Sequence, residues 1–201
     1  MYQREALWLG FDGAEWKPNA VKVAIGGVNA VSGTVWEEGL EPNPQNYIVC
    51  PDQPWLDGIN AGEGFIRQFV AMPLGSGKTV EAQITGREET GGIELVVFEP
   101  KPGKFPDRPP ETSEPEVAVM EAMPVDAEMG LGAGGQIKQK IYADPYGIET
   151  WAQQNYARLN FHILNSEQYR EITGLEPPPT PITAETYVEH GLPWFDLYDE
   201  S

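Results

Sequence analysis

Cysteine, histidine and basic residues are scarce in this 201-residue sequence. The single cysteine, Cys50, leaves no partner for a disulfide within the chain, which favours a reducing compartment. Long apolar runs are also missing: residues 20–31, the most apolar stretch, include Lys22 and fall well short of the roughly 20 residues of a membrane-spanning helix. Arg4 and Glu5 stand where the apolar part of a secretory signal would begin. We therefore predict a cytoplasmic protein without a membrane-spanning segment.

The charge is strongly one-sided. Thirteen Lys and Arg residues oppose 31 Asp and Glu residues, which gives a formal net charge of -18. A field of that sign repels the phosphates of nucleic acids and of anionic lipids, so both are excluded as non-specific partners. A cationic partner or a divalent metal ion is compatible with it.

Residues 75–79, GSGKT, resemble a phosphate-binding loop, and three observations speak against that function. The motif needs a glycine five residues before Gly77, where the sequence has Met72. A helix must follow the loop, whereas residues 79–85 alternate apolar and polar side chains and predict a strand. The acidic chain also offers few cations for a phosphate. We interpret the motif as a hairpin turn in which glycines supply positive φ angles.

Short alternating or apolar segments separated by turn residues predict a mainly β protein. The 22 glycines and 19 prolines fit many turns. We expect an antiparallel sandwich or distorted barrel of meander hairpins, followed by two short C-terminal helices. The expected strands are 5–11, 20–25, 46–51, 65–72, 79–85, 93–99, 117–123, 136–144 and 157–164.

Capping residues predict the two helices. Ser166 precedes the first, which stops at Gly174, and Thr183 precedes the second, which stops at Gly191. Residues 100–116 are too rich in proline and charge for a core element.

The Pro-rich stretch suggests a domain organisation. It predicts a linker or long loop at 100–116 between an N-terminal β lobe at 1–99 and a C-terminal lobe of strands and short helices at 117–201. The two lobes could also form one compact unit.

The loop at 51–64 has the side chains of a binding site. Asp52, Asp57 and Glu63 surround Trp55, and Asp52 to Glu63 spans the twelve residues of an EF-hand calcium loop. The ligand pattern within that span is otherwise poor, so calcium stays one alternative beside a turn whose Asp side chains cap backbone amides. A pair such as Asp52 and Asp57 could also serve as general acid and base in a hydrolase.

A thiol nucleophile is a further alternative, since a histidine can activate a cysteine. His162 and His190 are the only histidines. His162 lies in an apolar run and is predicted to be a core residue, while His190 stands at the predicted end of a helix. Cys50, between Val49 and Pro51, is predicted to be a small buried apolar residue.

Aromatic residues beside acids mark candidate contact surfaces. Trp55 lies next to Asp57 in the loop, and the C-terminal segment contains Trp194, Phe195 and Asp196. Such rings can stack on a sugar or anchor a protein partner.

Three motifs, QPWLDGI, RQFVAMPLGSG and GLPWFDLYDE, resemble a family of bacterial and fungal proteins. The resemblance covers most of the chain. It implies no activity, cofactor or site residue, because none is known for that family.

These observations favour a non-catalytic binding or interaction module for a protein, a carbohydrate or a cation. Its candidate ligand-binding residues are Asp52, Trp55, Asp57, Glu63, Trp194, Phe195 and Asp196. One alternative is a hydrolase that uses acidic residues, with or without a metal ion. Another is a structural component that assembles with copies of itself, which would require an exposed strand edge.

Overall fold

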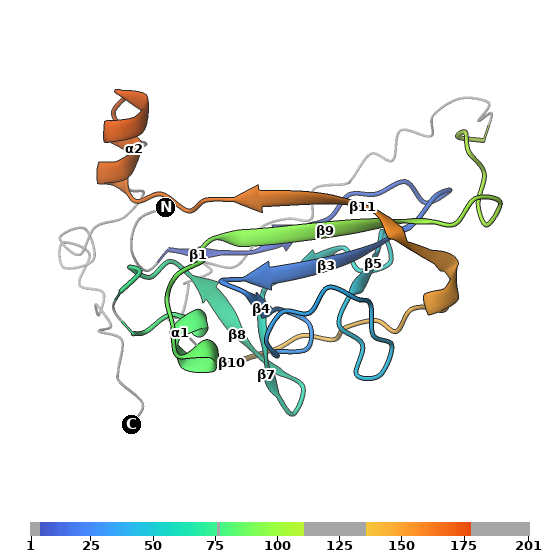
Figure 1. Cartoon of the computed structure of the whole chain (residues 1–201), viewed down its shortest axis with the longest axis horizontal. Coiled ribbons are helices and arrows are strands. Elements are labelled where there is room, and N and C mark those ends of the chain that lie inside the picture. The colour runs from blue at the N-terminus through green and yellow to red at the C-terminus, as the bar shows by residue number, and fades with distance from the viewer. Residues whose placement is uncertain (1–4, 76, 111–135, 178–201) are drawn as a thin grey trace, which may run out of the picture.

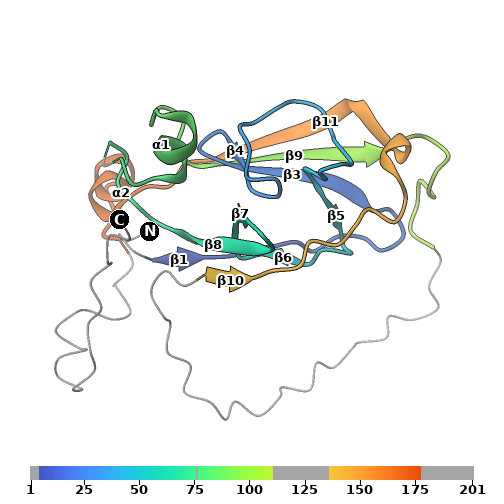
Figure 2. The same ribbon diagram turned by 90° about the horizontal axis from the view of Figure 1, so that it is seen from below.

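The computed structural model describes residues 5–75, 77–110 and 136–177 and folds them into two layers of antiparallel strands (Figures 1 and 2). The prediction of a mainly β antiparallel sandwich is confirmed, and the sheets do not close into a barrel. The elements in chain order are β1 (Ala6–Leu7), β2 (Leu9–Gly10), β3 (Asn19–Ile25), β4 (Val28–Asn29), β5 (Ile48–Cys50), β6 (Trp55–Leu56), β7 (Gly58–Gly62), β8 (Phe65–Val70), α1 (Val80–Thr85), β9 (Ile93–Pro100), β10 (Gln136–Lys138), a 3-10 helix (Ile148–Thr150), β11 (Trp151–Phe161) and α2 (Ser166–Thr173).

Strands that are far apart in the sequence form each layer. The first layer has the order β11-β9-β3-β4, with β5 also paired to β3. The second has the order β1-β8-β10, with β7 also paired to β8, and the short β2–β6 ribbon pairs separately. Figure 2 shows β3, β9 and β11 above β1, β8 and β10. Strands from both sides of the Pro-rich stretch therefore share both layers.

The main core lies between the two layers. In β3, Val21 and Val23 point toward the second layer because alternate side chains of a strand face opposite sides. Burial of such apolar side chains is the main favourable contribution to folding. The buried members of this core are Val21, Val23, Val28, Ala30, Val31, Ile48, Cys50, Leu56, Ile59, Phe69 and Ile93.

The opposite face of the first layer is covered as well, by the loop between β4 and β5 and by the chain before β11. Its buried apolar cluster consists of Ala20, Leu40, Tyr47, Val49, Val96, Phe98 and Trp151. Strand β3 is consequently covered on both faces.

Lys22 of β3 is fully buried under that loop. Its Nζ donates hydrogen bonds to the carbonyl oxygens of Glu37 and, at 2.5 Å, Gly39, and it lies 4.5 Å from the centre of the Trp36 ring. Burial lowers the pKa of Lys22, against the opposing effect of nearby carboxylates. The carbonyls and the ring replace the water that the ammonium group loses.

A partly buried carboxylate organises the chain before β11. The carboxylate of Asp144 accepts hydrogen bonds from Tyr47 Oη at 2.6 Å and Trp151 Nε1 at 2.8 Å through one oxygen. Its other oxygen accepts from the backbone N–H groups of Tyr146 and Gly147. Burial, together with the Asp144 carboxylate, raises the pKa of Tyr47. This carboxylate therefore ties the segment to the first layer.

The prediction of a strand at 79–85 is wrong, because the structure has helix α1 there. Thr79 caps its first turn by accepting a hydrogen bond from the N–H of Ala82, and Gly86 ends it in the left-handed conformation. The alternating pattern misled because its polar member Glu81 is buried and its apolar member Ile84 is exposed.

The buried carboxylate of Glu81 explains that inversion. Its oxygens accept the backbone N–H groups of Glu89, Thr90 and Gly91 at 2.8–3.0 Å. Burial by itself raises the pKa of Glu81, but these hydrogen bonds outweigh it, so that the pKa is lower than usual. The backbone N–H groups of the turn at residues 89–91 thus hold the Glu81 side chain in its buried position.

Several strand boundaries also differ from the predictions. The strand expected at 5–11 divides into β1 and β2 around Trp8. The strand expected at 136–144 extends only to Lys138. The strand expected at 157–164 begins earlier, at Trp151, because its pairing with β9 runs back to Pro100 across an irregularity in register. The alternation of side chains within one segment carries no information about which other strand pairs with it.

Near the C-terminus, α2 ends at Gly174 as predicted, but Asn165 caps it instead of Ser166. Of the Pro-rich stretch, Pro100 ends β9 and residues 101–110 form turns and bends. The strand predicted at 117–123 and the helix predicted after Thr183 lie outside the described residues. No helix within the described residues has the length and apolar character needed to cross a membrane.

Candidate functional site

Two exposed tryptophans lie at the β2–β6 ribbon, Trp55 in β6 and Trp8 immediately before β2. Leu9 pairs with Leu56 and Gly10 pairs with Trp55. Leu9 and Leu56 belong to the main core, so the alternating residues Trp8 and Trp55 face outward. The two side chains are 72% and 49% exposed. Both rings therefore present much of their surface to solvent.

A carboxylate adjoins the Trp55 ring. Trp55 Nε1 donates a hydrogen bond to Asp57 Oδ2 at 3.1 Å, which fixes both side chains. Trp8 precedes Leu9 and Asp57 follows Leu56, so each is the chain neighbour of one member of the Leu9–Leu56 pair. The space over Gly10, opposite Trp55, is open, since a Cβ placed there would meet no atom within 4 Å. We call Trp8, Trp55 and Asp57 the tryptophan surface.

Two glutamine side chains hold the backbone beneath this surface. Gln53 Nε2 donates to the carbonyl oxygens of Trp55 and Lys140, and its Oε1 accepts the N–H of Tyr142. The amide of Gln139 likewise donates to the carbonyl oxygen of Trp55 at 3.0 Å and accepts the backbone N–H of Asp57, also at 3.0 Å. The surface consequently rests on backbone fixed at several points, which limits the entropy lost on binding.

Close packing on β8 fixes the position of Asp57 from the other side. The N–H of Phe69 donates to the carbonyl oxygen of Asp57 at 3.2 Å. The next residue, Gly58, lies so close to β8 that a Cβ would come within 2.1 Å of the carbonyl oxygen of Arg67. Only glycine fits at this position, which explains the Asp-Gly pair of the sequence.

The other two predicted acidic residues of the loop lie elsewhere. Asp52 is exposed in the turn before β6, and Glu63 is exposed at the tip of the β7–β8 hairpin with φ of 53°. No group of three or more His, Cys, Asp or Glu side chains that could hold a metal ion occurs within residues 5–75, 77–110 and 136–177. Calcium binding by Asp52, Asp57 and Glu63 stays a prediction.

The cysteine is buried, as the sequence predicted. Burial, assisted by the nearby charge of Asp52, raises the pKa of the Cys50 thiol to about 12, so it carries its proton at neutral pH and is a poor nucleophile. The prediction that His162 belongs to the core is wrong: it follows the last residue of β11 and is exposed. His190 lies outside the described residues.

The GSGKT motif already binds an anionic side chain, the carboxylate of Glu88. Glu88 accepts hydrogen bonds from the N–H of Gly77 at 3.1 Å and from the hydroxyl of Thr79 at 2.5 Å. The hydroxyl and backbone donors lower the pKa of Glu88. A helix does follow this motif, contrary to the prediction, so the case against a phosphate loop now rests on Met72, the acidic chain and the Glu88 carboxylate.

Sequence reasoning found Trp55 and Asp57 but missed Trp8, which stands in the apolar stretch EALWLGF. The alternation of Leu7, Trp8 and Leu9 was the available signal, because it places Trp8 on the opposite side from two core leucines. Gln53 and Gln139 gave no signal, since their partners are far away in the sequence. Trp194, Phe195 and Asp196 lie outside the described residues.

No known protein family, curated protein or solved structure matches this chain. The resemblance inferred from the sequence motifs therefore stays a prediction.

Proposed function

We propose that this chain is a non-catalytic binding module that holds a carbohydrate on the tryptophan surface. The observation that carries the proposal is a pair of exposed rings, Trp55 in β6 and Trp8 immediately before its partner strand β2, with Asp57 hydrogen-bonded to Trp55. An indole face offers a flat apolar surface to the C–H groups of a sugar ring.

Polar groups beside the rings support the same ligand. The Oδ1 atom of Asp57 accepts no hydrogen bond from the part of the chain that the structure describes, so it is free to accept one from a sugar hydroxyl. Tyr142, whose backbone N–H bonds to Gln53, adds a further exposed ring (44%), and its ring centre is 5.4 Å from the Nζ of Lys140. A neutral glycan also avoids the repulsion that a net charge of -18 imposes on acidic polysaccharides.

The test is isothermal titration of the full chain with the hexasaccharides of cellulose, xylan, chitin and starch. We expect at least one to bind, and Trp8→Ala or Trp55→Ala to weaken binding about tenfold, the effect of losing one stacked ring. Tyr156→Ala is the matched control, because this ring is 48% exposed on a distant strand.

Each contrary outcome has a distinct meaning. Binding that both tryptophan variants retain would place the site elsewhere. Failure of all four sugars to bind would reject a carbohydrate ligand and leave the rings as anchors for a protein. Repeating the titration with calcium and with a chelator, on wild type and Asp52→Asn, tests the calcium prediction.

A further inference from the structure

Strand β11 forms the upper edge of its sheet in Figure 1. It has eleven residues, whereas the described strands β1, β4 and β10 have two or three. Residues 154–161 are exposed, and within the described ranges only β9 pairs with β11. Its outer edge therefore presents a row of backbone donors and acceptors that a further strand can use.

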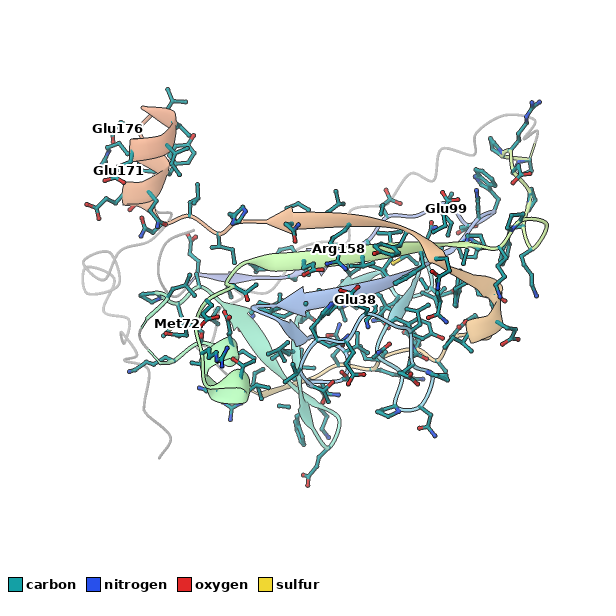
Figure 3. All side chains as sticks on the ribbon, in the orientation of Figure 1. Glu38, Met72, Glu99, Arg158, Glu171 and Glu176 are labelled. Atoms are coloured by element: carbon teal, nitrogen blue, oxygen red, sulfur yellow. The ribbon has the colours of Figure 1, made fainter. Side chains whose placement is uncertain are left out.

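From Tyr156 to Phe161, beyond the register irregularity that lies between Trp151 and Tyr156, the edge lacks most of the features that normally prevent strand pairing. Lysine, proline and inward-pointing charges are the usual ones, and β11 contains no lysine or proline. Its single charged residue, Arg158, forms ion pairs with Glu38 at 2.6 Å and Glu94 at 3.1 Å (Figure 3). In a chain with a net charge of -18, this edge is thus close to neutral.

Apolar side chains accompany the free edge. Leu159 and Phe161 are 51% and 48% exposed, although they share a sheet face with the core residues Leu95 and Ile93, their partners on β9. The second layer does not cover this part of the sheet. A strand added at the edge would bury both side chains.

We infer that β11 is a self-association edge, on which β11 of a second copy pairs antiparallel about a two-fold axis at Leu159. A two-fold axis perpendicular to a sheet keeps each face continuous, so paired residues must lie on the same face. With Leu159 opposite its own copy, Ala157 lies opposite Phe161 and Arg158 lies opposite Asn160. Centring the pair on Arg158 instead would place two cations opposite each other.

This register favours a second copy over an unrelated strand because the edge is complementary to itself. The small Ala157 makes room for the large Phe161 of the other copy, and the Leu159 pair continues the row of Val23 and Leu95 across the axis. The self-association edge lies in the layer opposite to the tryptophan surface. It does not depend on the proposed ligand.

The first experiment is sedimentation equilibrium of the full chain over a range of concentrations and salt. We expect a monomer–dimer equilibrium that salt strengthens, because two chains of charge -18 repel each other at low salt. Leu159→Lys should weaken the dimer roughly tenfold or more by placing two cations opposite each other. Val35→Lys, at a residue 53% exposed near β4, is the matched control.

A second variant guards against misfolding of the first. Asn160→Lys changes a polar, exposed position and places a lysine opposite Arg158 of the other copy, so it should weaken the dimer in a salt-dependent way. A wild type that stays monomeric, or a dimer that Leu159→Lys and Asn160→Lys leave intact, overturns the proposal. A monomer in which the amides of residues 156–161 that point away from β9 also resist hydrogen exchange overturns it too, because the edge would then be covered by its own chain.

Disulfide formation tests the register. Leu159→Cys should cross-link on oxidation, because self-paired residues lie about 4.5–5.5 Å apart between Cα atoms. Phe161→Cys is the control: four residues of strand separate its two copies, roughly 14 Å, which is too far for a disulfide. The buried native Cys50 contributes little background. Equal cross-linking of both variants would reject the two-fold axis at Leu159.

Discussion

Strands β3 and β11 flank the same partner, β9, yet most of β3 is buried and most of β11 is exposed. Residues that pair across β3, β9 and β11 form rows, and each row allows one residue of β3 to be compared with one residue of β11. One row contains Lys22, Val96 and Arg158, and the next contains Val23, Leu95 and Leu159. Each strand thus places a cation and an apolar side chain at matched positions.

The difference shows that the elements packed over a strand, more than the residue types of the strand itself, decide whether its side chains are buried in this sheet. Lys22 lies beneath the loop that contains Trp36, whereas Arg158 reaches Glu38 at the margin of that loop (Figure 3). A buried cation must find partners for its donors, while an exposed one keeps its water. Substitutions at matched positions should therefore have unequal effects.

The largest expected effect is at Lys22. Lys22→Ala should lower the free energy of unfolding by about 3 kcal/mol, because it leaves a cavity and removes the donor from two buried carbonyl groups. Arg158→Ala should cost only about 0.5 kcal/mol, as is usual for surface ion pairs. Urea denaturation of both variants measures the difference. Equal losses would contradict the comparison.

The row that contains Val23 and Leu159 should give a smaller difference in the free energy of unfolding. Val23→Ala should lower the free energy of unfolding by about 2 kcal/mol, since the side chain lies fully buried in the main core. Leu159→Ala removes more atoms, but we expect a loss below about 0.5 kcal/mol in the monomer, because that side chain is half exposed. Both values come from urea denaturation at a concentration where the protein is monomeric. A larger loss at Leu159 than at Val23 would show that β11 is covered.

A smaller effect than those of Lys22→Ala and Val23→Ala is expected at the end of β3, where Glu81 packs against Gly26. Glu81→Gln should cost about 1 kcal/mol at neutral pH, because an amide accepts the three backbone N–H groups less well than a carboxylate does.

Glu81→Gln should also change how the free energy of unfolding depends on pH in the acidic range. The folded pKa of Glu81 lies below its ordinary value of 4.5, so its contribution is complete above that pH and is lost as the pH falls through the folded pKa. Glu81→Gln should flatten this dependence in urea titrations at a series of acidic pH values. Glu171→Gln, on the outer side of α2 in Figure 3, is the control that should leave the dependence unchanged.

The residues of the site that could be predicted are those that contact each other within a few positions of the sequence. Trp55 and Asp57 could be recognised because the side-chain hydrogen bond between them spans two residues. Trp8 and the two glutamines could not, since their roles depend on the pairing of β2 with β6 and on contacts with residues 139–142. Asp52 and Glu63 were grouped with them by sequence distance alone.

The sequence by itself determined the β class, strands β3, β8 and β9, the end of α2 at Gly174 and the burial of Cys50, because each depends on periodicity or capping within a few residues. The tertiary structure alone decided that 79–85 is a helix, that Lys22 is buried and that His162 is exposed. In each of these cases the deciding partners lie on another segment: the turn at 89–91 for Glu81, the loop over β3 for Lys22, and an edge without cover for the end of β11. Local patterns record which side of a strand a residue faces, but only packing determines what lies on that side.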